Sequence, residues 1–177
     1  MNSLKIKQLT LSAICLSLCV LLPMVFHTIP NGGTIFLPMH IPVLVCGLMC
    51  GGLYGGLCGL LGPLLSSLIT GMPALSFAPA MMAECAVYGL CCGIMMKYVK
   101  TGKTALDLYI SLITSMLLGR VVSGFVKAFI LTPGISPFAW VGESLVVGVP
   151  GIVIQLILIP LLITALQKAG LINKRYE

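Results

Sequence analysis

Five long apolar runs that carry few charges constrain the fold of this chain more than any other feature of its sequence. In chain order they cover residues 8–26, 37–71, 79–99, 106–131 and 140–166. Only 8% of the 177 residues are charged, against about 25% in a soluble domain, and most of these charges lie at the edges of the runs. Since about 20 apolar residues suffice to span a bilayer as a helix, the sequence predicts an all-α integral membrane protein.

The second run is too long for a single span. It has about 35 residues where about 20 would suffice, and the glycine-rich segment 51–56 lies near its middle. Two helices hinged at these glycines would give six spans, whereas one long helix followed by a non-spanning segment would give five. Lys and Arg near span ends favour the cytoplasm, and only six spans put the basic clusters at 5–7, 97–103 and 168–175 on one side. We therefore expect six spans with both termini cytoplasmic.

We expect one membrane domain over residues 1–177, because the longest polar stretch is the short connection at 100–107. The predicted spans are 8–26, 38–53, 55–71, 79–99, 106–131 and 143–166. The first run follows two lysines, as a signal peptide would, but no small-residue cleavage site comes after it. The pattern indicates a retained first helix.

Several functional classes are excluded by the composition and the motifs. The net charge of +6 does not indicate a nucleic-acid partner, because the basic residues flank apolar runs instead of forming a patch. The 8 cysteines lie within apolar runs without a CxxC pair, so we interpret them as buried packing residues. Neither HExxH nor GxSxG occurs, and Lys97 replaces the first glycine of a phosphate loop before Gly102-Lys103-Thr104. We expect no enzymatic activity, cofactor or metal site.

Ionisable residues within the spans are the strongest functional candidates, since each is costly to place in a bilayer. Arg120 and Lys127 share one face of the fifth span, at depths of roughly 16 Å and 6 Å from its outer end. Glu84 lies roughly 8 Å deep in the fourth span, with Tyr88 one turn deeper, and can reach either cation. We expect these side chains to line a shaft that opens outward.

Two interpretations of the Glu84 and Arg120 charges stay open at this point. In one, they form a structural ion pair that holds two helices together. In the other, the pair is shared with a ligand, because the planar fork of Arg suits carboxylate or phosphate groups.

Further candidate ligand residues lie at the outer rim and in the last span. The rim residues are His40, Asn31, Trp140 and Glu143, and the last span contributes Gln155. Aromatic residues at such positions also serve as interface anchors, so Trp140 is as consistent with an anchor as with a ligand contact.

Small residues on the first span suggest a docking surface. Ala13 and Ser17 form a small-xxx-small pair, which lets helix backbones approach closely in lipid. This span carries no charged group within the membrane, so its small face is free to receive a partner helix.

These features resemble the substrate-binding S components of energy-coupling factor (ECF) vitamin transporters, in particular their pantothenate-type or uncharacterised branch. The likeness covers nearly the whole chain. It rests on the six-span pattern and on four segments: HIPVLVCGLMCGGLYGG at 40–56, PLLSSLITGMP at 63–73, MMAECAVYGL at 81–90 and LGRVVSG at 118–124.

The resemblance implies a subunit of an ABC-type importer in a bacterial cell membrane. The vitamin would be held near the outer face by spans 4 to 6 and the first loop, with pantothenate as the first candidate and pyridoxine-related compounds, hydroxymethylpyrimidine or α-ribazole next. The partners would be a membrane-embedded coupling subunit and two cytoplasmic ATPases. The family's AxxxA docking motif on the first helix matches Ala13 and Ser17, where serine replaces the second alanine.

Other classes of function make different demands on the sequence. A self-sufficient proton-coupled carrier would use Glu84 or His40 for coupling, but such carriers commonly show internal repeats, and none is detected here. A membrane enzyme would use either residue as a base, but the sequence lacks the catalytic motifs named above. A structural subunit would need only the ion pair. A chain without an energy source fits a substrate-capturing subunit best.

Overall fold

The computed structural model describes residues 3–26, 29, 32–132 and 134–170, and every regular element within them is helical. The elements are α1 (Ser3–Phe26), α2 (Gly32–Phe36), α3 (His40–Cys50), α4 (Gly52–Thr70), α5 (Ala78–Tyr98), α6 (Thr104–Val126), the π-helical turn η1 (Lys127–Leu131) and α7 (Pro137–Lys168). Six stretches of the described residues are long and apolar enough to cross a bilayer: Lys5–Phe26, Gly32–Cys50, Gly52–Thr70, Ala78–Tyr98, Thr104–Leu131 and Pro137–Lys168. The predicted all-α, six-span membrane fold is confirmed.

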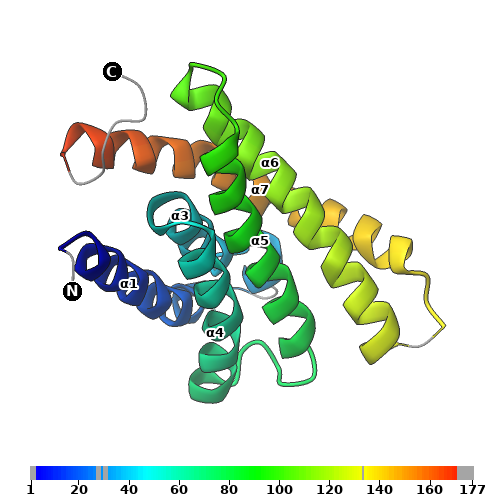
Figure 1. The fold of residues 1–177 in the computed structure, drawn as a ribbon. Helices are drawn as coiled ribbons and strands as arrows, with labels where there is room; N and C mark the ends of the chain where they lie inside the picture. The colour runs from blue at the N-terminus through cyan, green and yellow to red at the C-terminus, as the bar shows by residue number, and fades with distance from the viewer. Residues whose placement is uncertain (1–2, 27–28, 30–31, 133, 171–177) are drawn as a thin grey trace.

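The bundle is organised around α5, which packs against α3, α4 and α6 (Figure 1). α7 packs against α6, and α1 packs against α3 and α4 at one edge of the bundle. α1 is the least buried of the six spans, because only 11% of its most apolar window lies inside the protein. Most of α1 is therefore available to lipid or to another helix.

One end of the bundle in Figure 1 holds the start of α1, which carries Lys5 and Lys7, together with the last turns of α5 and α7, which carry Lys97 and Lys168. We call it the basic end. Gln8 Nε2 donates a hydrogen bond to the Cys50 carbonyl oxygen over 3.4 Å, so the start of α1 lies beside the turn between α3 and α4. Lys97, at the end of α5, lines a groove at the same turn. In Figure 1 the α4–α5 connection and the start of α7 lie at the other end, which we call the opposite end. The cytoplasmic location of the basic end stays a prediction.

A glycine cluster turns the chain back on itself between α3 and α4. Gly51 has a φ of +94°, which glycine adopts without steric penalty. The two helices then lie so close that a Cβ at Gly55 would be 2.5 Å from the Gly47 Cα and 2.6 Å from the Gly89 carbonyl oxygen. In lipid, helices associate through such close backbone packing because no hydrophobic force drives them together. The long apolar run thus forms two helices, and the break at Gly51 lies within the glycine-rich segment 51–56.

The last helix is longer than a bilayer requires. α7 has 32 residues and is about 48 Å long, against a hydrocarbon core of about 30 Å. It begins at Pro137, so Trp140 and Glu143 lie in its first turns. These two rim residues are thus held on a helix and not on a loop.

Gly59→Ala should destabilise the bundle, because a Cβ at this position would overlap the main chain of Cys85 on α5. Overpacking of this kind typically costs about 1–3 kcal/mol, so we expect a lower thermal unfolding midpoint in detergent. Gly56→Ala is the matched control, since its Cβ would lie 3.4 Å from the nearest atom, the Leu90 Cβ. Equal midpoints for the two variants would contradict the close packing of α4 against α5.

Candidate functional site

Glu84 lies at the centre of a buried polar cluster. Its Oε1 atom accepts one hydrogen bond from Tyr88 Oη, at 3.1 Å, and lies 3.1 Å from Arg120 Nη1. His40 Nε2 lies 3.5 Å from the same oxygen, and the His40 ring centroid is 5.1 Å from that of Tyr88. Glu84 and Arg120 are each only 4% exposed. The structure therefore brings together four of the predicted residues, from α3, α5 and α6, around one carboxylate.

Local sequence features set this arrangement. Glu84 and Tyr88 are four residues apart on α5, so they lie on one face of that helix and can bond to each other. Gly119, which directly precedes Arg120, leaves room for the Tyr88 ring against α6, since a Cβ at this position would overlap the ring. Close approach of α5 and α6 then places the guanidinium within reach of the carboxylate.

The guanidinium is only partly used by the ion pair. Nη1 contacts Glu84, but the buried Nε and Nη2 atoms of Arg120 have no hydrogen-bond partner among the described residues. The Ser123 hydroxyl, His40 Nδ1 and Gln155 Oε1 are likewise buried without a hydrogen-bond partner among the described residues, and His40 Nε2 has only its 3.5 Å approach to Glu84 Oε1. Buried polar atoms in proteins almost always have a hydrogen-bond partner. A group of unsatisfied polar atoms this large therefore indicates that water or a ligand binds among them.

The cluster is enclosed by the segment that precedes α3. Leu37 is 5% exposed, and its carbonyl oxygen accepts a hydrogen bond of 3.3 Å from Gln155 Nε2 on α7. A Cβ at Gly148 would lie 2.8 Å from Arg120 Nη2 and 3.2 Å from the Leu37 Cδ1, so both groups lie against this glycine. The sequence predicted a shaft that opens outward, whereas the two charged residues are closed off from solvent in this structure.

Leu37 adopts an unusual backbone conformation for this role. Its φ is +52°, in the left-handed region that costs a residue with a side chain about 1 kcal/mol or more. Two hydrogen bonds to the Leu37 carbonyl oxygen offset this strain. One comes from the His40 backbone N–H, at 3.1 Å, and the other from Gln155. Non-glycine residues in this region often mark functional sites.

The remaining predicted residues form a separate rim or lie elsewhere. Lys127 Nζ is 5.3 Å from the centroid of the Trp140 ring, and Trp140 Nε1 donates to Thr132 Oγ1 over 2.9 Å. Lys127 is half-buried and pairs with this ring, so of the two predicted cations the structure brings only Arg120 to Glu84. Glu143 is exposed on α7, and Asn31 lies outside the described residues.

Sequence reasoning missed Leu37, Gly148 and Gly119 as parts of this cluster. Each acts through a contact between segments that are distant in sequence, and a leucine or glycine in an apolar run gives little signal of such a contact. Only Gly119 offered a hint, because a residue without a side chain directly before a buried arginine permits close approach of a neighbouring helix.

The chain matches the family model described as "ECF transporter, substrate-specific component" over residues 7–164. This chain belongs to that family. No curated protein and no solved structure matches it. Members of the family are substrate-binding subunits of transporters and not enzymes, so the chain is the substrate-specific subunit of an ECF transporter, and membership implies a small-molecule substrate and association with an ECF module.

The predicted docking pair of this S component lies on an open surface. Ala13 and Ser17 are both exposed on α1, and the Ser17 hydroxyl donates a hydrogen bond of 3.0 Å to the Ala13 carbonyl oxygen of its own helix. The serine thereby satisfies its polar group locally. The replacement of alanine by serine thus preserves a small and internally bonded surface.

Charge removal at the ion pair should show non-additive effects on the stability of this S component. Arg120→Met leaves the buried Glu84 carboxylate without its cation, which typically costs about 3–5 kcal/mol, so we expect a much lower thermal midpoint. Adding Glu84→Gln should restore part of the loss, because both charges are then absent. Lys127→Met is the matched control, since this lysine contacts the Trp140 ring and not the carboxylate. A double variant no more stable than Arg120→Met would show that the two charges are not coupled.

Proposed function

We propose that this S component captures a small water-soluble vitamin or vitamin precursor at the Glu84–Arg120 cluster. One observation carries the proposal. Nε and Nη2 form one edge of the guanidinium fork, and at Arg120 this edge is buried and unpartnered while Nη1 is held by Glu84. A free edge of this kind makes two parallel hydrogen bonds to a carboxylate or phosphate.

The other orphan groups widen the range of ligand atoms that the cluster can bind. Ser123 offers a hydroxyl, His40 offers ring nitrogens and Gln155 offers a carbonyl oxygen that needs a donor. A ligand with a carboxylate, hydroxyls and an amide would match this set, which supports pantothenate as the first candidate. Pyridoxine-related compounds, hydroxymethylpyrimidine and α-ribazole follow because they carry hydroxyls and ring nitrogens but lack the carboxylate.

Residues outside the cluster contribute less to ligand binding. Lys127, Trp140 and Glu143 lie at the rim on η1 and α7, where they would meet the ligand on entry, and Asn31 belongs to the proposed site by its place in the first loop. The segment around Leu37 must move before a ligand reaches Arg120, because the guanidinium is enclosed. Entry at the opposite end would then face the outside of a bacterial cell, with both termini and the basic end in the cytoplasm.

Energy for uptake would come from partner proteins. The sequence has no phosphate-binding loop, so we propose that a membrane-embedded coupling subunit and two cytoplasmic ATPases drive transport. The exposed Ala13 and Ser17 supply a small face on α1 on which the coupling subunit could dock.

Arg120→Lys separates ligand binding from structural pairing. Lysine keeps a positive charge beside Glu84 but lacks the planar fork, so we expect a nearly unchanged thermal midpoint and a roughly ten- to a hundredfold weaker affinity for a carboxylate ligand. Calorimetry with pantothenate, pyridoxine, hydroxymethylpyrimidine and α-ribazole measures the affinity. Lys127→Ala is the control, for which we expect a smaller loss because this cation is half-buried at the rim.

Two results would overturn this assignment. Unchanged affinity in Arg120→Lys would mean that the guanidinium edge does not contact the ligand. Uptake by vesicles that contain this chain alone, without any ATPase, would instead support a proton-coupled carrier.

Ala13→Leu combined with Ser17→Leu should abolish ATP-driven uptake and leave ligand affinity intact. Two bulky side chains would keep a partner helix from the close backbone approach that small residues allow. Thr164→Leu with Ala165→Leu is the control, since both residues are exposed on α7. Normal transport by the α1 double variant would remove this face from the docking surface.

A further inference from the structure

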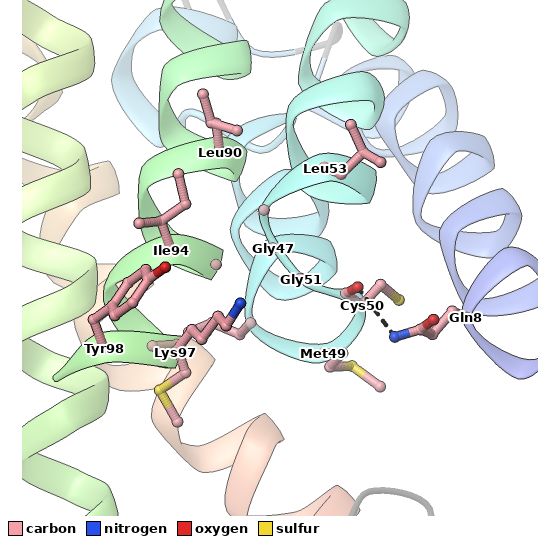
Figure 2. Close-up of a pocket in the computed structure, with 14 residues that line it drawn as sticks. Gln8, Gly47, Met49, Cys50, Gly51, Leu53, Leu90, Ile94, Lys97 and Tyr98 are labelled. Atoms are coloured by element: carbon pink, nitrogen blue, oxygen red, sulfur yellow. Dashed lines mark hydrogen bonds between the residues drawn. The ribbon is translucent and has the colours of Figure 1, made fainter. Parts of the chain in front are cut away.

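A groove at the basic end is separate from the polar cluster. Its volume is about 640 Å³, and it lies between the start of α1, the α3–α4 turn and the end of α5 (Figure 2). Figure 2 shows Lys97 and Tyr98 on α5 across the opening from Gln8 and Met49. None of the residues that line it takes part in the Glu84 cluster.

One side of the groove is apolar and faces outward from the bundle. Leu53 on α4 is 70% exposed, and Leu90 and Ile94 on α5 are each 42% exposed, so these side chains point toward the bilayer. Glycines of the α3–α4 turn also line the groove, and a Cβ at one of them, Gly51, would meet no atom within 4 Å. Open space over a bare backbone, beside an apolar wall, gives room for a polar group attached to an apolar chain.

The other side of the groove is cationic. Lys97 is exposed, and its ammonium lies 5.5 Å from the centroid of the Tyr98 ring. Among the residues that the structure describes, no acidic side chain lines the groove. The nearest acidic side chain in sequence, Asp107 on α6, is buried and accepts hydrogen bonds from the Thr101 backbone N–H and hydroxyl. Lys97 is therefore not neutralised by a carboxylate that lines the groove.

We propose that this groove binds one anionic phospholipid from the adjacent leaflet. The phosphate would lie at Lys97, with the headgroup over the Gly51 turn, and an acyl chain would follow Leu53, Leu90 and Ile94 into the bilayer. Charge complementarity selects the headgroup, since basic pockets between membrane helices at the lipid surface favour anionic headgroups. The apolar side of the groove favours a lipid over a free anion, because a free anion would leave Leu53, Leu90 and Ile94 uncovered.

Native mass spectrometry of the purified full chain tests the proposal. The protein is released from detergent after mixing with phosphatidylglycerol or with phosphatidylcholine of the same chain length. We expect phosphatidylglycerol to be retained preferentially and Lys97→Gln to lower its apparent affinity about fivefold, the effect of one lysine near an anionic surface. Lys100→Gln is the matched control, because this lysine is exposed at the same end but does not line the groove.

A second pair of variants tests the apolar wall. Leu53→Trp should fill the groove and reduce retention of phosphatidylglycerol, whereas Leu57→Trp, one turn along α4 and outside the groove, should not. Thermal midpoints of all four variants establish that each is folded.

Four outcomes would overturn the proposal. Equal retention of the two lipids, or equal losses in Lys97→Gln and Lys100→Gln, would show that the groove does not select an anionic lipid. Displacement of the lipid by inorganic phosphate at a similar concentration would indicate a free-anion site. A change in oligomeric state with Leu53→Trp, seen in the same spectra, would make the groove a contact between copies of this chain.

Discussion

The carboxylate of Glu84 determines how α3, α5 and α6 meet at the centre of this bundle. A charge within the hydrocarbon region is costly, so it must be paired with cations or hydrogen-bond donors from neighbouring helices. Glu84 Oε1 takes one donor from its own helix, α5, and one from α6, and it lies within ion-pair distance of His40 on α3. These contacts require α3, α5 and α6 to turn the faces that carry His40, Glu84 and Arg120 toward one another. Because the carboxylate engages only one nitrogen of Arg120, the same interaction leaves the remaining edge of the guanidinium without a protein partner.

The two ends of the bundle differ in how regular their backbone is. At the basic end, α3, α4 and α5 touch along glycines, and such close packing leaves little freedom to rearrange. At the opposite end the chain includes the π-helical turn Lys127–Leu131 and the left-handed Leu37. Single π-helical turns recur at functional sites, and strained residues persist only where their surroundings hold them. The protein thus combines a rigid base with an end whose backbone departs from regular geometry around the polar cluster.

Much of the fold followed from the sequence, because span length and charge bias act locally. The split of the long apolar run could be placed at the glycine cluster, because only six spans put the three basic clusters on one side. Proximity of Glu84, Tyr88 and Arg120 could also be expected from depth and helical face. The pairing of Lys127 with Trp140 and the enclosure by Leu37 could not, because they depend on how α6 and α7 are rotated against each other and on a backbone angle that no sequence pattern indicates.

The enclosure by Leu37 has a consequence for the rate at which any solute could reach Arg120. The hydrogen bond from Gln155 to the Leu37 carbonyl oxygen and the side-chain packing at Gly148 hold the segment closed. The left-handed backbone of Leu37 favours its opening, because opening would relieve the strain. A solute entering by this route must wait for these contacts to break. Its observed association rate would then rise with concentration only up to a plateau, set by the opening of the segment and not by diffusion.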